Sequence, residues 1–483
     1  MRRLAPAIAL GVAALSVAAR SWLLATRPLW HDEVFTVWIS RLEPRQLLRA
    51  LRFDSGPPLF YLLEKPLVAA AEALALPDAA ARILPFLAIT LLFAGGRDLP
   101  AGSRRRFFWL AASSPLFLLY ASEARAYGVL ALLGFALFRL TVCDAPGPAI
   151  LAAIVLTTAV LPWIHYLGIV VTLSLLVGAL LTRRWRTALA VGVGLAFFLP
   201  WVPALLAQPA AATGWIRDGI GVSAGGFFAA LGGSARVLPP FGRPLPEPLL
   251  WLAGATGISL LALLLFLRPL DSASRMGLCA VLLTLGGIVV ISFWRPIAVA
   301  GRTEMAVLPI WLWLAARAGE ESRLARQLVA GVAVIGVLSS LLILASPRAS
   351  RPLAEIPPRL ESSARAGDLI VATANFYLPA LLSRNRGRLV ADLRAFPTDL
   401  AAHPGWFRGQ TPSEEDYRRL AADVQRVGPV RAVYFLLDPL FWTPRLRQIL
   451  LARGPSSQPE KLPYGLLVVS PARSLGLAGD HQE

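Results

Sequence analysis

Lysine and cysteine are almost missing from this chain of 483 residues. Lysine occurs only at Lys65 and Lys461, so arginine supplies nearly all of the positive charge behind the net charge of +18. Cys143 and Cys279 lie in or beside apolar segments and have no neighbours at the spacing of metal ligands. Two such cysteines argue against a disulfide framework, and we interpret both as packing residues.

The sequence also lacks an internal repeat and a glycine-rich phosphate loop. The pairs Gly225-Gly226 and Gly232-Gly233 fall in a stretch that we expect to be an outer loop, without the strand-to-helix context of a nucleotide site. No cluster of histidine, cysteine, aspartate and glutamate has clear metal spacing, so these residues do not require a metal. These absences argue against a nucleotide-binding domain, and they leave a divalent metal open.

Apolar residues are abundant, at 56% of the chain, and the mean hydropathy is +0.61. Soluble domains are roughly 45–50% apolar, so the composition favours an integral membrane protein that contacts membrane lipids. The sequence pI of about 11.2 would suggest nucleic acid in a soluble protein. Here the arginines lie mostly in short loops between apolar runs, where membrane topology explains them and no nucleic-acid partner is needed.

The apolar runs predict about eleven transmembrane helices. The first, residues 4–25, contains Arg20 and the small residues Val17-Ala18-Ala19, so a cleaved signal peptide is the alternative. The many later runs favour an uncleaved helix with its N-terminus in the cytoplasm. Several runs are shorter than the ~20 residues that span a bilayer, so their ends must extend into flanking polar residues. The later runs are 82–95, 107–121, 127–142, 150–164, 167–181, 188–206, 249–267, 276–294, 303–316 and 328–345.

The arginine-rich loops predict the topology. There are four main basic loops, and all of them fall on the cytoplasmic side if residues 57–76 do not cross the membrane. We therefore expect 57–76, with Glu64, Lys65 and Glu72, to be a helix that lies at the outer interface or re-enters it. The arginines of the four loops are Arg97 with Arg104–Arg106, then Arg183, Arg184 and Arg186, then Arg268 and Arg275, then Arg317, Arg323 and Arg326.

The composition becomes that of a soluble domain after a linker rich in proline and arginine at 346–358. Residues 368–372, 388–392, 432–437 and 465–470 predict short strands, and 414–427 and 443–453 predict helices. We therefore expect two domains. Residues 1–345 form an α-helical polytopic membrane domain, and residues 346–483 form a small C-terminal α/β domain outside the cytoplasm.

Two acidic motifs follow the first apolar run. Asp32 and Glu33 are adjacent carboxylates at a membrane boundary, where charge is costly unless it has a task. We interpret the pair as a general base with a neighbouring carboxylate that orients the acceptor. The alternative is a helix cap before the amphipathic run 34–39. Asp54 precedes the rigid pair Pro57-Pro58, and its alternative is an ordinary turn residue.

Several further polar side chains share the outer side of the membrane in this topology. Each has a structural alternative: an ion pair for the Glu-Ala-Arg motif, packing for the histidine, and snorkelling for the last arginine. Their common side strengthens the functional interpretation. They are Glu123, Arg125, Tyr127, His165, Tyr166 and Arg302.

These motifs together resemble those of the GT-C membrane glycosyltransferases. The similarity is to the bacterial branch related to protein O-mannosyltransferases and to the lipid A aminoarabinose transferase, and it covers roughly residues 1–345. The matching motifs are Trp30-His31-Asp32-Glu33, Asp54 with Pro57-Pro58-Leu59-Phe60-Tyr61, Ser122-Glu123-Ala124-Arg125-Ala126-Tyr127, His165-Tyr166, and Arg302 with Leu308-Pro309.

The resemblance implies transfer of a hexosyl or pentosyl group, with inversion, from a polyprenyl-phosphate donor. The acceptor would be a lipid, a glycan or a protein outside the cytoplasm, at the cytoplasmic membrane of a bacterial cell envelope. Asp32 would be the base and Glu33 its support, with no cofactor required and a divalent metal left open. Gly56 stands where relatives often have His or Lys, so a phosphate or acceptor contact made there is either missing from this chain or supplied by Lys65 or Arg302. The substrate-binding residues would be Asp54, Lys65, Glu123, Arg125, Tyr127, His165, Tyr166 and Arg302.

Two other classes of membrane protein have sequences with similar features. A transporter or flippase of lipid-linked sugars also has many helices and intramembrane charges. Against it, the chain has no two-fold repeat of broken helices, and the acidic residues gather at one face instead of at the midplane. A structural or sensory membrane protein with a ligand-binding outer domain is the third class. Transfer of a labelled sugar distinguishes the enzyme from both.

Overall fold

The chain forms two compact units in the computed structural model. The first comprises Met1–Arg27 and Ser55–Ala349, and the second comprises Pro28–Asp54 and Ser350–Glu483. The second unit thus includes residues 28–54, which the sequence analysis placed with the membrane domain. The structure describes residues 15–23, 29–74, 78–210, 213, 216, 224–236, 245–266, 270–345, 360, 362–372, 391–397, 412–427, 431–437, 443–451, 460–462 and 465–470.

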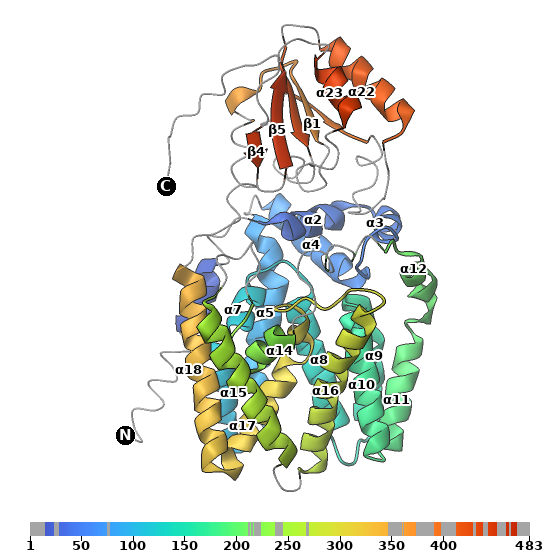
Figure 1. Cartoon of the computed structure of the whole chain (residues 1–483). Coiled ribbons are helices and arrows are strands. Elements are labelled where there is room, and N and C mark those ends of the chain that lie inside the picture. The colour runs from blue at the N-terminus through green and yellow to red at the C-terminus, as the bar shows by residue number, and fades with distance from the viewer. Residues whose placement is uncertain are drawn as a thin grey trace. The chain divides into compact units, whose positions relative to one another are not determined.

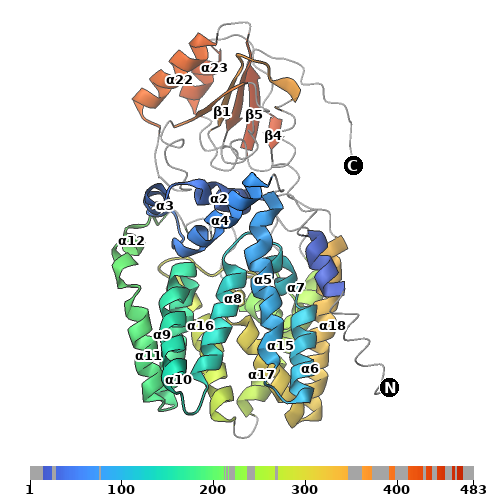
Figure 2. The same cartoon turned by 180° about the vertical axis from the view of Figure 1, so that it is seen from behind.

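The first unit is a bundle of helices (Figures 1 and 2). Residues 15–23 are helical, and the later elements are α4 (Leu59–Ala73), η1 (Asp78–Arg82), α5 (Ile83–Leu92), η2 (Phe93–Gly96), α6 (Ala101–Ser113), α7 (Pro115–Ala121), α8 (Tyr127–Thr141), α9 (Pro148–Ile164), α10 (Leu167–Leu181), α11 (Trp185–Ala196), η3 (Leu199–Trp201), α12 (Val202–Ala207), α14 (Ala224–Leu231), α15 (Glu247–Phe266), α16 (Ser272–Ser292), η5 (Thr303–Ala306), α17 (Leu308–Glu321) and α18 (Arg323–Ala345).

The apolar runs become helices close to the predicted bounds. Residues 167–181 are α10 without change, and α18 begins at Arg323, five residues before the apolar run, as a short run in a bilayer requires. Among the described residues, four helical stretches are long and apolar enough to cross a membrane, namely 185–207, 247–266, 272–292 and 323–345. Four shorter apolar helices accompany them. The polytopic helical class is confirmed, and the count of eleven stays a prediction.

Two local predictions were wrong. The run 107–121 is two helices, because Pro115 has no N–H to continue α6 and the Ser114 hydroxyl instead accepts a hydrogen bond from the Phe117 N–H, at 3.3 Å, to begin α7. The expected outer loop around Gly225-Gly226 contains α14, which packs against α15. Gly232 follows α14, and a Cβ there would lie 1.8 Å from the Ala253 carbonyl oxygen, so glycine permits the close approach to α15.

Residues 59–73 form the single helix α4, as the sequence analysis predicted for 57–76. Both views show α4 lying across one end of the bundle instead of along its helices (Figures 1 and 2). It packs against η1 and α9, and its buried face carries Phe60, Tyr61, Glu64 and Val68. This orientation is the one that the arginine distribution requires.

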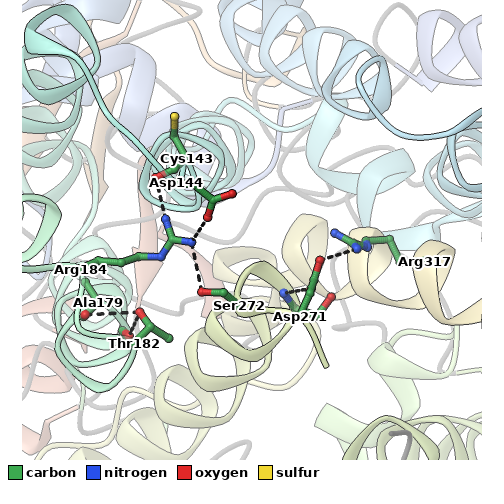
Figure 3. A network of polar contacts seen from close by, with 10 residues as sticks. Cys143, Asp144, Ala179, Thr182, Arg184, Asp271, Ser272 and Arg317 are labelled. Carbon is green, nitrogen blue, oxygen red and sulfur yellow. Dashed lines mark hydrogen bonds and ion pairs between the residues drawn. The ribbon is translucent and has the colours of Figure 1, made fainter. Parts of the chain in front are cut away.

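The predicted basic loops meet at one end of the bundle, which we call the basic end. The Arg184 guanidinium contacts Asp144 Oδ1 at 2.5 Å and donates to the Ser272 hydroxyl at 3.1 Å (Figure 3). Arg317 pairs with Asp271 at 2.6 Å. Three loops that are distant in the sequence are thus joined.

The fourth basic loop reaches the same helix α17. Arg106 on α6 pairs with Glu320 at 2.9 Å and donates to the Ala316 carbonyl at 2.8 Å. All four predicted basic loops therefore lie at one end of the bundle, as a single cytoplasmic side requires. Arg268 of the third loop lies outside the described residues.

The second unit contains α2 (His31–Arg41), α3 (Pro44–Leu51) and a five-stranded sheet with two helices, α22 (Glu414–Arg426) and α23 (Pro444–Leu451). The strand order is β2-β1-β3-β5-β4, with β1 parallel to β2 and β3, and β5 antiparallel to β3 and β4. The strands are β1 (Leu369–Ala372), β2 (Asp392–Ala395), β3 (Val433–Leu437), β4 (Glu460–Leu462) and β5 (Gly465–Ser470).

Residues on alternate sides of the strands build two apolar layers. Val371 and Phe435 lie in one layer with Tyr417 and Leu420 of α22, while Ile370 lies in the other. A strand buried on both faces reads as the continuous apolar run that the sequence shows. The small C-terminal sheet is confirmed. The strand expected at 388–392 instead begins at Asp392, and residues 388–390 and the linker 346–358 lie outside the described residues.

Candidate functional site

The Glu-Ala-Arg motif occupies a tight turn between α7 and α8. The Ser122 hydroxyl donates to the Leu119 carbonyl at 2.9 Å and so ends α7. The Arg125 N–H donates to the Glu123 carbonyl at 2.7 Å, which closes the turn. Glu123 is buried and Arg125 is partly exposed. The turn thus holds two opposite charges at the start of α8.

Aromatic rings connect this turn to the end of α9. The Tyr127 ring lies 4.9 Å from the Tyr120 ring and 4.9 Å from the His165 imidazole, measured between centroids. Tyr120 is the last aromatic residue of α7, and His165 directly follows α9. Three segments that the sequence separates therefore meet through their rings.

His165 is held in its neutral form. Its Nδ1 accepts a hydrogen bond from the Leu167 N–H at 3.1 Å, which requires an unprotonated Nδ1. Burial, followed by the positive charges of Arg125 and Arg302, lowers the pKa of His165 to about 3. The same charges place His165, Arg125 and Arg302 within electrostatic range of one another. His165 is therefore a neutral group among cations.

Arg302 lies in a turn between α16 and η5 that several contacts fix. Gly301 has a positive φ of 82°, and a Cβ there would lie 2.1 Å from the Arg236 carbonyl oxygen, so glycine is required. The Tyr120 hydroxyl donates to the Gly301 carbonyl at 2.6 Å. Glu304 Oε1 accepts from the Gly301 N–H at 2.9 Å. Both sides of Gly301 are held, and the buried Arg302 follows it directly.

Tyr166 joins the proline motif to the same region. Its hydroxyl donates to the Gly56 carbonyl at 3.2 Å and accepts from Trp201 Nε1 at 2.9 Å. Gln208 Nε2 also donates to the Gly56 carbonyl, at 3.3 Å. The turn before Pro57-Pro58 is thus fixed by residues from two other segments. Lys65 lies farther along α4 and is partly exposed.

The structure brings together six of the predicted substrate-binding residues, which with Tyr120, Gly301 and Glu304 we call the site end. These six are Glu123, Arg125, Tyr127, His165, Tyr166 and Arg302. Sequence analysis missed Tyr120 and Glu304. Tyr120 directly precedes the Ala-Ser-Glu-Ala-Arg stretch, and Glu304 is the one carboxylate in the apolar run 303–316, so each left a weak signal.

Asp32, Glu33 and Asp54 belong to the second unit and are described with it. Asp32 and Glu33 lie in the first turn of α2, where the helix dipole favours negative charge. The N-cap residue is Trp30, not Asp32, and its N–H donates to Glu33 Oε2 at 3.2 Å. Glu33 therefore has a capping contact, whereas Asp32 does not occupy the cap. Asp54 is buried just after α3.

The described residues contain no group of three or more histidine, cysteine, aspartate or glutamate side chains that could hold a metal ion. The expectation that no cofactor is required, with a divalent metal left open, stays a prediction. The site end offers two guanidiniums, one neutral imidazole, three tyrosine hydroxyls and the buried carboxyl groups of Glu123 and Glu304. Such a set suits binding of a phosphate group and of a sugar.

The chain combines a bundle of apolar helices with a small sheet later in the sequence. The first unit supplies the bundle, and the second unit supplies the sheet. Comparison with solved structures shows which known fold has these two parts.

The chain is similar over nearly its whole length to ArnT from Cupriavidus metallidurans. The apo crystal structure of that protein matches with a TM-score of 0.56 at 14% identity, covering 99% of this chain and 98% of that one. The crystal structure bound to undecaprenyl phosphate matches with a TM-score of 0.57 at 15% identity, covering 99% of both chains. No family model and no curated protein sequence matches. The fold expected from the motifs is confirmed.

Proposed function

We propose that this protein transfers a sugar from a polyprenyl-phosphate donor to an acceptor on the outer face of the cytoplasmic membrane. The observation that carries the proposal is the gathering of Arg125, Arg302 and the neutral His165 at one end of the bundle. The ArnT fold supports it, since that protein has been solved with undecaprenyl phosphate bound.

The chemistry needs a base, a stabilised leaving group and an oriented acceptor. The acceptor hydroxyl attacks the anomeric carbon and gives its proton to Asp32, while Glu33 orients it. The bond between the anomeric carbon and the phosphate oxygen breaks, and polyprenyl phosphate leaves with the bonding electrons. A single displacement of this kind inverts the anomeric centre. Arg302 and Arg125 stabilise the phosphate, because a guanidinium offers two parallel hydrogen bonds to its oxygens.

The other predicted residues complete the substrate contacts. Tyr127 and Tyr166 offer hydroxyls and ring faces to the sugar, and Glu123 and Asp54 accept from its hydroxyl groups. Gly56 has no side chain for a phosphate contact, so Arg302, with Lys65 as the second candidate, takes that task. The acceptor is a lipid, a glycan or a protein of the cell envelope.

The experiment uses purified full-length protein in lipid nanodiscs. Polyprenyl-phosphate donors carrying radiolabelled hexosyl or pentosyl groups are incubated with cell-envelope extracts, and label in the acceptor fraction is counted. We expect transfer that requires the protein and that releases polyprenyl phosphate. A flippase would instead move labelled donor across a liposome membrane without breaking the sugar–phosphate bond. Movement without transfer would contradict the proposal.

A further inference from the structure

One carboxyl group at the site end has a hydrogen-bond partner for only one of its two oxygens among the described residues. Glu304 is fully buried. Its Oε1 accepts from the Gly301 N–H at 2.9 Å, while its Oε2 has no hydrogen-bond partner among the described residues. A buried polar oxygen left without a partner is unfavourable. This oxygen therefore either carries a proton or faces a ligand.

Aromatic and charged residues of both signs lie in the segments next to this carboxyl group. The Tyr120 hydroxyl lies within electrostatic range of Glu304 and of Arg302. The turn that contains Glu304 packs against α8, α10, α16 and α17. The titratable and charged residues of the neighbouring segments are Tyr120 of α7, Glu123 and Arg125 of the following turn, Tyr127 of α8, His165 before α10, Arg236 beside Gly301, Arg295 after α16, and Arg302.

We propose that Glu304 is a phosphate-binding residue of this site, a carboxylic acid whose Oε2–H donates a hydrogen bond to the phosphate of the polyprenyl-phosphate lipid. This inference rests on the proposed function, because it takes its ligand from it. An ionised Oε2 would repel the phosphate, whereas a protonated one adds a donor beside Arg302. The other oxygen holds the Gly301 N–H and so fixes the turn from which Arg302 extends.

Binding of the phosphate then takes up a proton from solvent. Wherever the free protein is ionised at Glu304, the phosphate selects the protonated form. Affinity for phosphate falls as pH rises above the pKa of Glu304 in the free protein.

The test measures binding of undecaprenyl phosphate to full-length protein in detergent by calorimetry, in two buffers of different ionisation enthalpy. Wild type is compared with Glu304→Gln, which keeps an oxygen for Gly301 and a donor for the phosphate but does not titrate. Glu247→Gln is the control, since Glu247 is exposed at the start of α15. Near neutral pH we expect wild type to take up more protons than Glu304→Gln, up to about one for each lipid bound. As pH rises through the pKa of Glu304, wild-type affinity should fall relative to that variant by up to about tenfold for each pH unit.

Equal proton uptake and equal pH dependence in wild type and Glu304→Gln would overturn the inference. If Glu304→Gln does not fold, proton uptake by the wild-type protein alone tests the inference. Uptake beyond that of the lipid in protein-free micelles supports the inference, and zero uptake or proton release overturns it. The two proposals fail separately. Lipid binding with proton uptake but without sugar transfer refutes only the proposed function, and transfer without this uptake refutes only the role of Glu304.

Discussion

Charged side chains have different surroundings at the two ends of α10. Beyond its last turn, Arg184 pairs with Asp144, a side chain that is 91% exposed. Before its first turn, His165 is kept neutral next to Arg125 and the buried Arg302. Charges at the basic end are neutralised by partners that water also solvates, and topology explains them. At the site end, Glu123 and Arg302 are buried. Burial of charged groups opposes folding and is typical of groups with a functional task.

The contrast predicts where substitutions reduce activity. The largest loss is expected from Asp32→Asn, which keeps the side-chain shape and removes the basic oxygen. Loss of a general base costs on the order of 10²–10⁴ in rate. Initial transfer rates at saturating donor, with protein amounts matched, measure this effect.

Glu33→Gln should reduce the transfer rate less than Asp32→Asn does, because a glutamine oxygen can still accept a hydrogen bond from the Trp30 N–H. Asp271→Asn, at the basic end, should turn over at the wild-type rate. If Asp32→Asn is fully active and Glu33→Gln is inactive, Glu33 is the base and Asp32 is the neighbour that orients the acceptor. Full activity of both variants would place the base elsewhere.

The next largest effect concerns affinity for the donor. Arg302→Ala should weaken binding of the polyprenyl-phosphate donor by roughly 10–100-fold, since hydrogen bonds to charged groups contribute about 1.5–3 kcal/mol. Arg317→Ala at the basic end should leave donor binding unchanged. Arg295→Ala, which loses contacts to the Leu205 and Gln208 carbonyls, should have a smaller effect than Arg302→Ala. Direct binding of donor lipid to the three variants is the measurement, and an unaffected Arg302→Ala would remove Arg302 from the site.

A smaller effect is the pH dependence of stability that His165 causes. Since the pKa of His165 is lowered to about 3, the unfolded chain binds a proton below about pH 6.5, whereas the folded chain does not bind it until about pH 3. The contribution of His165 to stability therefore falls as pH drops from 7 toward 3.

Thermal unfolding in detergent between pH 5 and 7.5 checks this sign. His165→Gln should reduce the loss of stability at the acid side by a few degrees relative to wild type. An unchanged or larger loss at the acid side in His165→Gln would contradict the assignment of His165 as neutral.

The smallest effect is expected at the basic end. Exposed ion pairs stabilise proteins by about 0–1 kcal/mol. Asp144→Asn should therefore change the unfolding temperature by a few degrees at most and leave donor binding intact. A double-mutant cycle with Arg184→Ala measures the pair. A loss of donor binding in Asp144→Asn would show that the basic end also contributes to donor binding, which contradicts the account.

The sequence was sufficient to predict helices that are built from local apolar runs. The bounds of α10 and α8 follow closely from their apolar runs, as does the end of α18, and the basic loops follow from their arginines. Contacts between distant segments could not be predicted, since nothing near Gly56 indicates that Tyr166 and Gln208 donate to its carbonyl. Glu304 was missed because a single carboxylate in an apolar run has no motif. The break at Pro115 was missed because the apolar pattern continues through it.

Photo-crosslinking of a polyprenyl-phosphate probe tests the central claim most directly. A diazirine placed next to the phosphate is activated with the full-length protein in nanodiscs, and the labelled peptides are identified by mass spectrometry. We predict labels in residues 120–127, 165–166 and 301–304 of the site end, and their displacement by excess undecaprenyl phosphate. Displaceable labels confined to the basic end, around Asp144, Arg184 and Arg317, would contradict the account.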